Sequence, residues 1–70
     1  MRYRLIMFGF SAMCEDLGEV SLRLRGIPMQ RADLEGIDQC YLVDLQKKRQ
    51  YKIALIKGEY QVMFDSYEDL

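Results

Sequence analysis

Three short runs of alternating residues in the second half of the chain constrain its fold more than any other feature. They span 41–45, 51–56 and 60–65. Each run places an apolar residue, most often a β-branched or aromatic one, at every second position, as half-buried strands do. A polar segment at 46–50 and a Lys57-Gly58-Glu59 turn separate them, and the glycine can adopt the positive φ that a tight hairpin needs. The sequence therefore predicts a three-stranded antiparallel meander over residues 40–65.

The first half of the chain contributes two more predicted strands. Residues 2–10 alternate at first and then become apolar on both faces, which is typical of a strand covered more fully at one end. Residues 19–25 alternate cleanly, with Val20, Leu22 and Leu24 on one face. This pattern predicts a half-buried strand whose inward positions include Leu22.

Two segments have the composition of short helical turns. Ser11 can cap a turn within 11–18 that ends at Gly18, and Gln30 to Glu35 can form another that Gly36 closes. The predicted fold is therefore mostly β: a five-stranded antiparallel twisted sheet or small open barrel with a C-terminal meander and one or two short helical turns. An α+β arrangement is the alternative.

The length of 70 residues allows a single small domain (1–70) with a thin core, since such a domain buries only about 60% of its unfolded surface. Domains of this size often gain stability from disulfides, a metal or an oligomer interface. Only Cys14 and Cys40 are present, and there is no histidine. We expect two buried free thiols and no metal. Without a signal peptide or a long apolar run, we expect a cytoplasmic protein with no membrane contact.

The inventory of reactive groups argues against catalysis. Without histidine, the serine and cysteine triads are excluded, and the scattered glycines form no phosphate-binding loop. The acidic pairs Glu15-Asp16 and Glu68-Asp69 lie in a predicted turn and at the end of the chain, where solvation is expected. A chain this thin also has little room for a pocket of about 300 Å³. We therefore expect a non-enzymatic protein without a cofactor.

Charge is distributed unevenly, although the net charge is only −1. Residues 47–57 carry five cations and no acid, whereas 59–70 carry four acids and no cation. The cluster at Lys47, Lys48 and Arg49, extended by Lys52, could contact phosphates, and Tyr41, Tyr51 and Tyr60 could offer stacking faces. The other interpretation is a solvated hairpin tip that prevents edge-to-edge aggregation, with the tyrosines in the core or at its rim.

Apolar richness favours a binding role. Half of the residues are hydrophobic, more than a thin core can hide. Met13 and Met29 lie in the irregular segments, where an exposed apolar side chain would suit a partner, and Met7 is expected in the core.

The leading hypothesis is a small protein-interaction module. It would bind or block a partner protein, as inhibitors from phages and plasmids do, or it would self-associate as a homodimer, most simply by adding a strand to a sheet edge. The predicted partner-binding residues are Met13, Met29, Lys47, Lys48, Arg49 and Lys52. The alternative is a nucleic-acid-binding β domain that uses the basic hairpin at 47–57.

Overall fold

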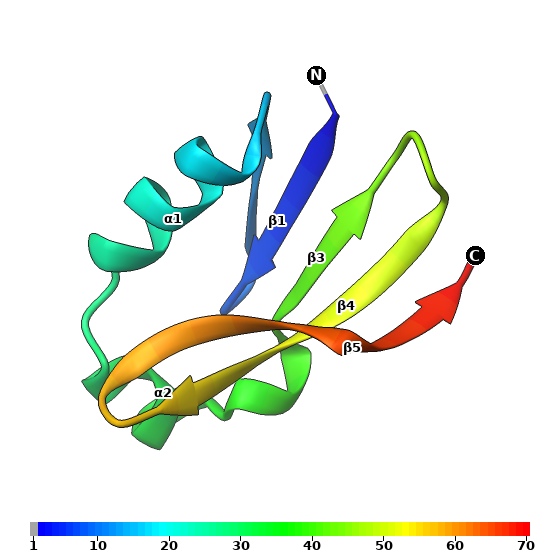
Figure 1. Ribbon diagram of the computed structural model, residues 1–70. Helices are drawn as coiled ribbons and strands as arrows, with labels where there is room; N and C mark the ends of the chain where they lie inside the picture. The colour runs from blue at the N-terminus through cyan, green and yellow to red at the C-terminus, as the bar shows by residue number, and fades with distance from the viewer. Residues whose placement is uncertain (1) are drawn as a thin grey trace.

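Five antiparallel strands form one open sheet in the computed structural model, which describes residues 2–70 except for the side chain of Asp33. The strands are β1 (Tyr3–Met7), β2 (Phe10–Cys14), β3 (Tyr41–Asp44), β4 (Arg49–Ile56) and β5 (Glu59–Asp69). Their order in the sheet is β2-β1-β3-β4-β5 (Figure 1). Two helices, α1 (Leu17–Arg25) and α2 (Gln30–Glu35), and a 3-10 turn, η1 (Ile37–Gln39), connect β2 to β3. The mostly β prediction and its C-terminal meander are confirmed.

The first two strands arise differently from the prediction, because residues 2–14 form a hairpin. Phe8 and Gly9 make a two-residue turn with φ values of 46° and 86°, which reverses the chain inside the segment predicted as one strand. Two successive positive φ angles are typical of the hairpin turn whose twist matches that of the sheet. Ser11 therefore lies in β2, and the helical turn predicted for 11–18 is wrong.

The strand predicted at 19–25 is also wrong, because these residues belong to α1. The Asp16 carboxylate accepts a hydrogen bond from the backbone N–H of Glu19 at 2.8 Å, which caps the helix. Val20 and Leu24 are one helical turn apart and both are buried. Leu22, predicted to point inward, lies on the opposite side of the helix with 67% of its surface exposed.

The remaining turns follow their sequence signals. Residues 30–35 form a helix, and Gly36 ends it with a φ of 82°. Lys57 and Gly58 form the β4–β5 turn with φ values of 52° and 79°. The polar segment before β4 is a turn over 45–48.

The core lies between one face of the sheet and α1. Alternate residues of β1, β3 and β4 supply most of it, and α1 packs against β1, β2 and β5. Cys14 and Cys40 are buried and free, and Met7 is fully buried, as predicted. The largest fully buried side chains are Leu5, Met7, Leu42, Val20, Asp44, Cys14 and Cys40.

A change of register in β5 shapes this face. Tyr51 pairs with Tyr67, whereas Ile53 pairs with Val62, so four residues of β5 (63–66) lie opposite Lys52 alone. Such a bulge bends and twists a strand. β5 is accordingly strongly curved in Figure 1, and its first half reaches α1.

Candidate interaction surfaces

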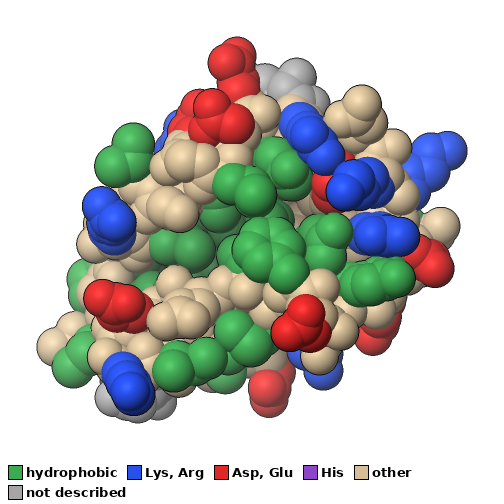
Figure 2. Space-filling view, viewed as in Figure 1, with side chains coloured by type: hydrophobic (Ala, Val, Ile, Leu, Met, Phe, Trp, Pro, Cys, Tyr) green, Lys and Arg blue, Asp and Glu red, His purple; other side chains and the backbone are tan. Residues whose placement is uncertain are grey.

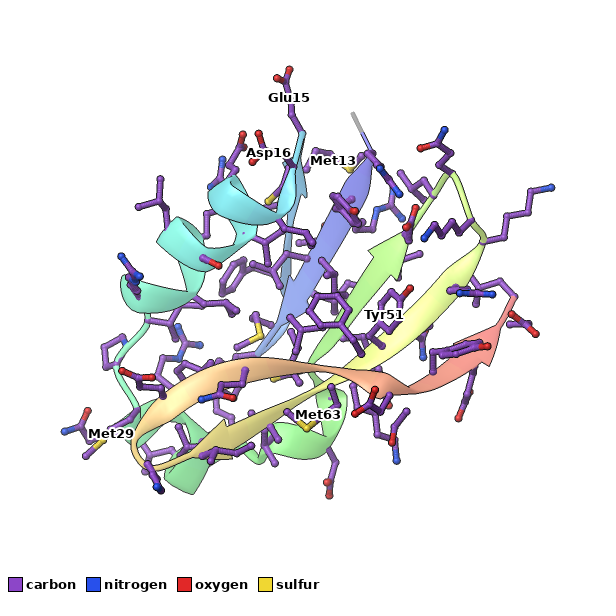
Figure 3. The ribbon with its side chains drawn as sticks, viewed as in Figure 1. Met13, Glu15, Asp16, Met29, Tyr51 and Met63 are labelled. Atoms are coloured by element: carbon purple, nitrogen blue, oxygen red, sulfur yellow. The ribbon has the colours of Figure 1, made fainter. Side chains whose placement is uncertain are left out.

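The six predicted partner-binding residues do not form one surface. Met13 is half-buried on β2, with its side chain on the sheet face opposite the core. Met29 precedes α2, and its sulfur lies 3.4 Å from where a Cβ on Gly58 would be. Figure 3 places these two methionines at distant ends of the molecule. Met29 is largely exposed, as predicted, but it also packs against the β4–β5 turn.

The cations at 47–49 separate into two environments. Lys47 and Lys48 are exposed in the β3–β4 turn, and Lys48 has a φ of 56°. Arg49 begins β4 and is half-buried, with its guanidinium 4.3 Å from the centre of the Tyr67 ring and 3.7 Å from an Asp69 carboxylate oxygen. Lys52 is exposed on the other face of the sheet, because it is three residues further along the same strand.

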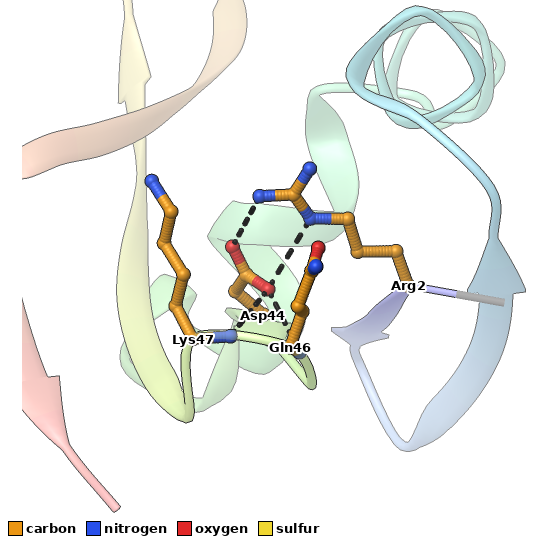
Figure 4. A network of polar contacts seen from close by, with 4 residues as sticks. All are labelled: Arg2, Asp44, Gln46 and Lys47. Carbon is orange, nitrogen blue, oxygen red and sulfur yellow. Dashed lines mark hydrogen bonds and ion pairs between the residues drawn. The ribbon is translucent and has the colours of Figure 1, made fainter.

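Asp44 fixes the conformation of this turn. Its buried carboxylate accepts hydrogen bonds from the backbone N–H groups of Gln46 at 3.0 Å and Lys47 at 3.1 Å (Figure 4). The Arg2 guanidinium approaches the same carboxylate, with its Nη2 at 3.3 Å. The turn that presents Lys47 and Lys48 is therefore tied to the N-terminal strand.

These contacts also set the charge of Asp44. Burial alone would raise the pKa of its carboxyl group. The hydrogen bond from the Lys47 N–H, the hydrogen bond from Arg2 and that from the Gln46 N–H outweigh burial and hold the pKa below its usual value. Asp44 is thus a structural anion beneath the basic turn.

Aromatic rings form a cluster beside Arg49. The Tyr51 ring lies edge-on to Phe64 at 5.1 Å between centroids and edge-on to Tyr67 at 6.0 Å. Tyr51 is buried beneath the other two rings. Tyr60 is also buried, and Tyr41 is half-buried on the opposite face. The positions of Tyr41, Tyr51 and Tyr60 therefore fit a place in the core or at its rim better than a role as stacking faces for nucleic acid.

A groove continues from this cluster toward α1. It has a volume of about 670 Å³ and runs between α1 and residues 58–62 and 64 of the β4–β5 hairpin. Leu17 and Phe64 line it with 41% and 48% of their surfaces exposed, above the buried Val20 and Leu24. From the sequence we expected little room for a pocket of about 300 Å³, and the volume found here is larger than that. The space is an open groove and not a closed pocket.

We call the groove and the adjoining rings the α1–β5 surface, defined by Leu17, Val62, Phe64 and Tyr67. Figure 2 shows hydrophobic side chains gathered at the centre of this face, with Lys and Arg side chains at its upper right. The cations beside it include Arg49, which stacks on Tyr67. An exposed apolar area next to a basic area is the main surface feature of this face.

The α1–β5 surface was not predicted from the sequence. One signal was available, because Asp16 and Glu19 have the spacing of a helix-capping box and would have placed Leu17 at the start of a helix. Phe64 and Tyr67 are three positions apart and would face opposite sides of a regular strand. Only the bulge in β5 brings both onto Tyr51.

The two thiols lie in protected environments. Burial raises the pKa of Cys14, with Arg23 opposing the shift and Glu19 and Asp16 adding to it. Burial also raises the pKa of Cys40, against a backbone hydrogen bond from Phe8. Both thiols are held in the protonated form, which is the weaker nucleophile. Among the side chains that the structure describes, which leave out Asp33, no group of three Cys, Asp or Glu is arranged to hold a metal ion.

In the described part of the chain, neither helix has the length or the apolar character needed to cross a bilayer. A comparison of the chain with protein-family models, with curated proteins and with solved structures finds no match.

Proposed function

We propose that this protein is a non-enzymatic interaction module that binds a partner protein through the α1–β5 surface. The observation that carries the proposal is the exposure of Leu17, Phe64 and Tyr67 on one continuous face. Their exposed fractions are 41%, 48% and 44%. Single exposed apolar residues are ordinary, but a contiguous group beside a groove is characteristic of binding sites.

The cluster has the build of an interaction hot spot. Aromatic rings supply a large apolar contact area and lose little conformational entropy when they bind. Phe64 and Tyr67 already rest on the buried Tyr51, and Arg49 lies over Tyr67. Their side chains are therefore partly ordered before a partner arrives, which reduces the entropic cost of association.

The charges beside the cluster indicate the partner's chemistry. Lys47 and Lys48 project from a turn that Asp44 holds, next to Arg49. A partner with an apolar centre and acidic residues at one side would match this arrangement. The lysines would then mainly increase the rate of association, because exposed charges steer encounter more than they hold a complex together.

Nucleic acid is the second candidate, and the cations at the end of the sheet are the observation in its favour. Arg2 and Arg49 each lie over a tyrosine ring, at 5.1 Å from Tyr3 and 4.3 Å from Tyr67. Both arginines are, however, engaged with carboxylates of Asp44 and Asp69. Their charge is therefore partly neutralised within the protein, which favours the protein partner.

Photo-crosslinking tests the proposal. A photoreactive phenylalanine analogue replaces Phe64 in one variant and Leu34 in a matched control. Leu34 is a good control because it is an apolar residue with 84% exposure on α2, outside the α1–β5 surface. We expect a discrete crosslinked protein from the Phe64 position in the cells that make this chain, and none from the Leu34 position.

A Phe64→Glu variant provides the second half of the test. The same partner should be lost from a pull-down with this variant and retained with Leu34→Glu. Identical crosslinks at both positions, or equal retention by both variants, would show that the α1–β5 surface is not the binding site. Material released by nuclease would favour the nucleic-acid alternative.

A further inference from the structure

β2 leaves one side of the sheet open to pairing. Its sequence, Phe10–Cys14, contains no charged residue and no proline, and its register with β1 is unbroken. Natural edge strands are usually protected by charges, proline, bulges or a covering element. β5, at the opposite side of the sheet, has a register shift and acidic residues, and its first half faces α1 across the groove.

The direction of the free backbone groups on β2 follows from the hydrogen bonds of β1. The backbone N–H of Leu45 donates to the Arg2 carbonyl at 2.8 Å, so the even-numbered residues of β1 bond toward β3. The odd-numbered residues therefore bond toward β2, where they meet Phe10, Ala12 and Cys14. The backbone groups of Ser11 and Met13 consequently point away from β1, toward the outer edge.

We propose that this protein forms a two-fold symmetric dimer by antiparallel pairing of β2 with β2 of a second copy. An axis beside Ala12 places Ser11 of each copy opposite Met13 of the other. These are the residues whose N–H and C=O groups face outward, so the pair forms about four backbone hydrogen bonds in phase with the existing ladder. The two five-stranded sheets become one continuous sheet.

The register of β2 suits a second copy as the occupant, because its two outward-facing residues, Ser11 and Met13, become each other's partners across the two-fold axis. In this register, Glu15 of one copy lies opposite the uncharged Gly9 of the other, so no two like charges are directly opposed. Pairing of β2 with β5 would instead be head-to-tail and open-ended, whereas the two-fold arrangement closes.

A charge swap tests this register. In Ser11→Glu/Met13→Glu and in Ser11→Lys/Met13→Lys, both substituted side chains lie on the sheet face away from the core. Each double variant opposes like charges in every Ser11–Met13 pair, so self-association should weaken by more than about tenfold. An equimolar mixture should restore the dimer through opposite charges. Gln61→Glu, on the other edge strand, is the control and should dimerise like the parent protein.

Sedimentation velocity over a wide concentration range measures these states, and circular dichroism checks folding. Amide hydrogen exchange on the unmodified protein provides an independent measurement. Protection of the Ser11 and Met13 amides should rise with protein concentration, while the Ala12 amide, bonded to β1, stays protected throughout. The proposal would be overturned if the parent protein remained monomeric or if the double variants dimerised like the parent. It would also be overturned if exchange of the Ser11 and Met13 amides did not depend on protein concentration.

Discussion

The Tyr60 hydroxyl donates a hydrogen bond to the carbonyl oxygen of Pro28 at 2.7 Å. This contact joins the β4–β5 hairpin to the connection between α1 and α2, 32 residues away in the sequence. The Tyr60 ring also lies edge-on to Phe8, with 5.9 Å between centroids. The hairpin turn, the first β-turn and the helical connection are thereby held together at one end of the molecule.

Tyr60→Phe should remove the hydroxyl and keep the ring contact with Phe8. We expect a loss of about 0.5–1.5 kcal/mol in the free energy of unfolding, the usual net value of one intramolecular hydrogen bond. Urea denaturation measures it. Tyr41→Phe, at a half-exposed position on the other face, is the matched control and should cost less. Equal losses in the two variants would mean that the Pro28 contact contributes nothing.

Two leucines of α1 provide a direct test of the helix. Leu24→Ala should destabilise by about 2–5 kcal/mol because it empties a buried aliphatic site, as should Ile53→Ala in β4. Leu22→Ala should change stability by less than about 0.5 kcal/mol, because the side chain is exposed. Thermal unfolding distinguishes them. In a strand, Leu22 and Leu24 would share a face, so similar losses at both positions would contradict the helix.

Asp44→Asn should reduce the dependence of the free energy of unfolding on pH in the acidic range. The folded pKa of Asp44 is lowered, so its carboxylate contributes stability fully above the unfolded value of about 3.9. This contribution is lost as the pH falls through the lower folded pKa. At pH 7 the variant should be less stable by about 1.5–3 kcal/mol, the range for hydrogen bonds to a charged group.

Urea titrations of both proteins between neutral and acidic pH measure the difference. The gap between the parent protein and Asp44→Asn should close toward low pH, where the parent carboxyl also becomes neutral. Asp38→Asn, at an exposed position in η1, is the control. A gap that stays constant over the whole pH range would show that the charge of Asp44 is not the cause.

Substitution of the lysines in the β3–β4 turn should distinguish a protein partner from a nucleic-acid partner. Lys47→Ala/Lys48→Ala should fold normally, because both side chains are exposed. We expect neither the parent nor this variant to bind random single- or double-stranded oligonucleotides, since the acids of β5 repel phosphates. Fluorescence anisotropy at several salt concentrations measures this. Adding Arg49→Ala also removes the stacking on Tyr67, so that triple variant is compared separately.

If the parent protein bound oligonucleotides with micromolar affinity that weakens as salt is added, nucleic acid would become the favoured partner in place of a protein. The slope of log K against log salt should then shrink by roughly 0.7–0.9 for each phosphate contact that the variants lose. With an acidic protein partner, the same variants should instead slow association and leave dissociation nearly unchanged.

The sequence by itself determined the C-terminal half of the fold. Alternation with β-branched and aromatic residues specified the strands of the meander, and Gly36 and Gly58 marked the positions that need a positive φ. These signals are local, because side-chain period and backbone conformation depend on a few neighbouring residues. Burial of Met7 and Ile53 was predictable from the same alternation, whereas burial of Cys14 and Cys40 was predicted from the behaviour of free cysteines in general.

The tertiary structure decided the first half and the α1–β5 surface. The spacing of Val20, Leu22 and Leu24 suits a strand, whereas that of Leu17, Val20 and Leu24 suits a helix, so the pattern alone is ambiguous. The helical conformation of residues 17–25 buries Val20 and Leu24 against the apolar face of the sheet, so the packing of α1 on the sheet favours the helix. The prediction of five strands was right, but the strand predicted at 19–25 is a helix, and the one predicted at 2–10 ends at Met7, so that β2 occupies residues 10–14.

The same limit applies to contacts between distant residues. Arg2 meets Asp44 across 42 positions, and Phe64 and Tyr67 share Tyr51 only because β5 bulges against β4. The register of a strand depends on the neighbouring strand with which it pairs and on how the sheet curves around the core. These are properties of the assembled chain, whereas alternation and turn chemistry are properties of each segment.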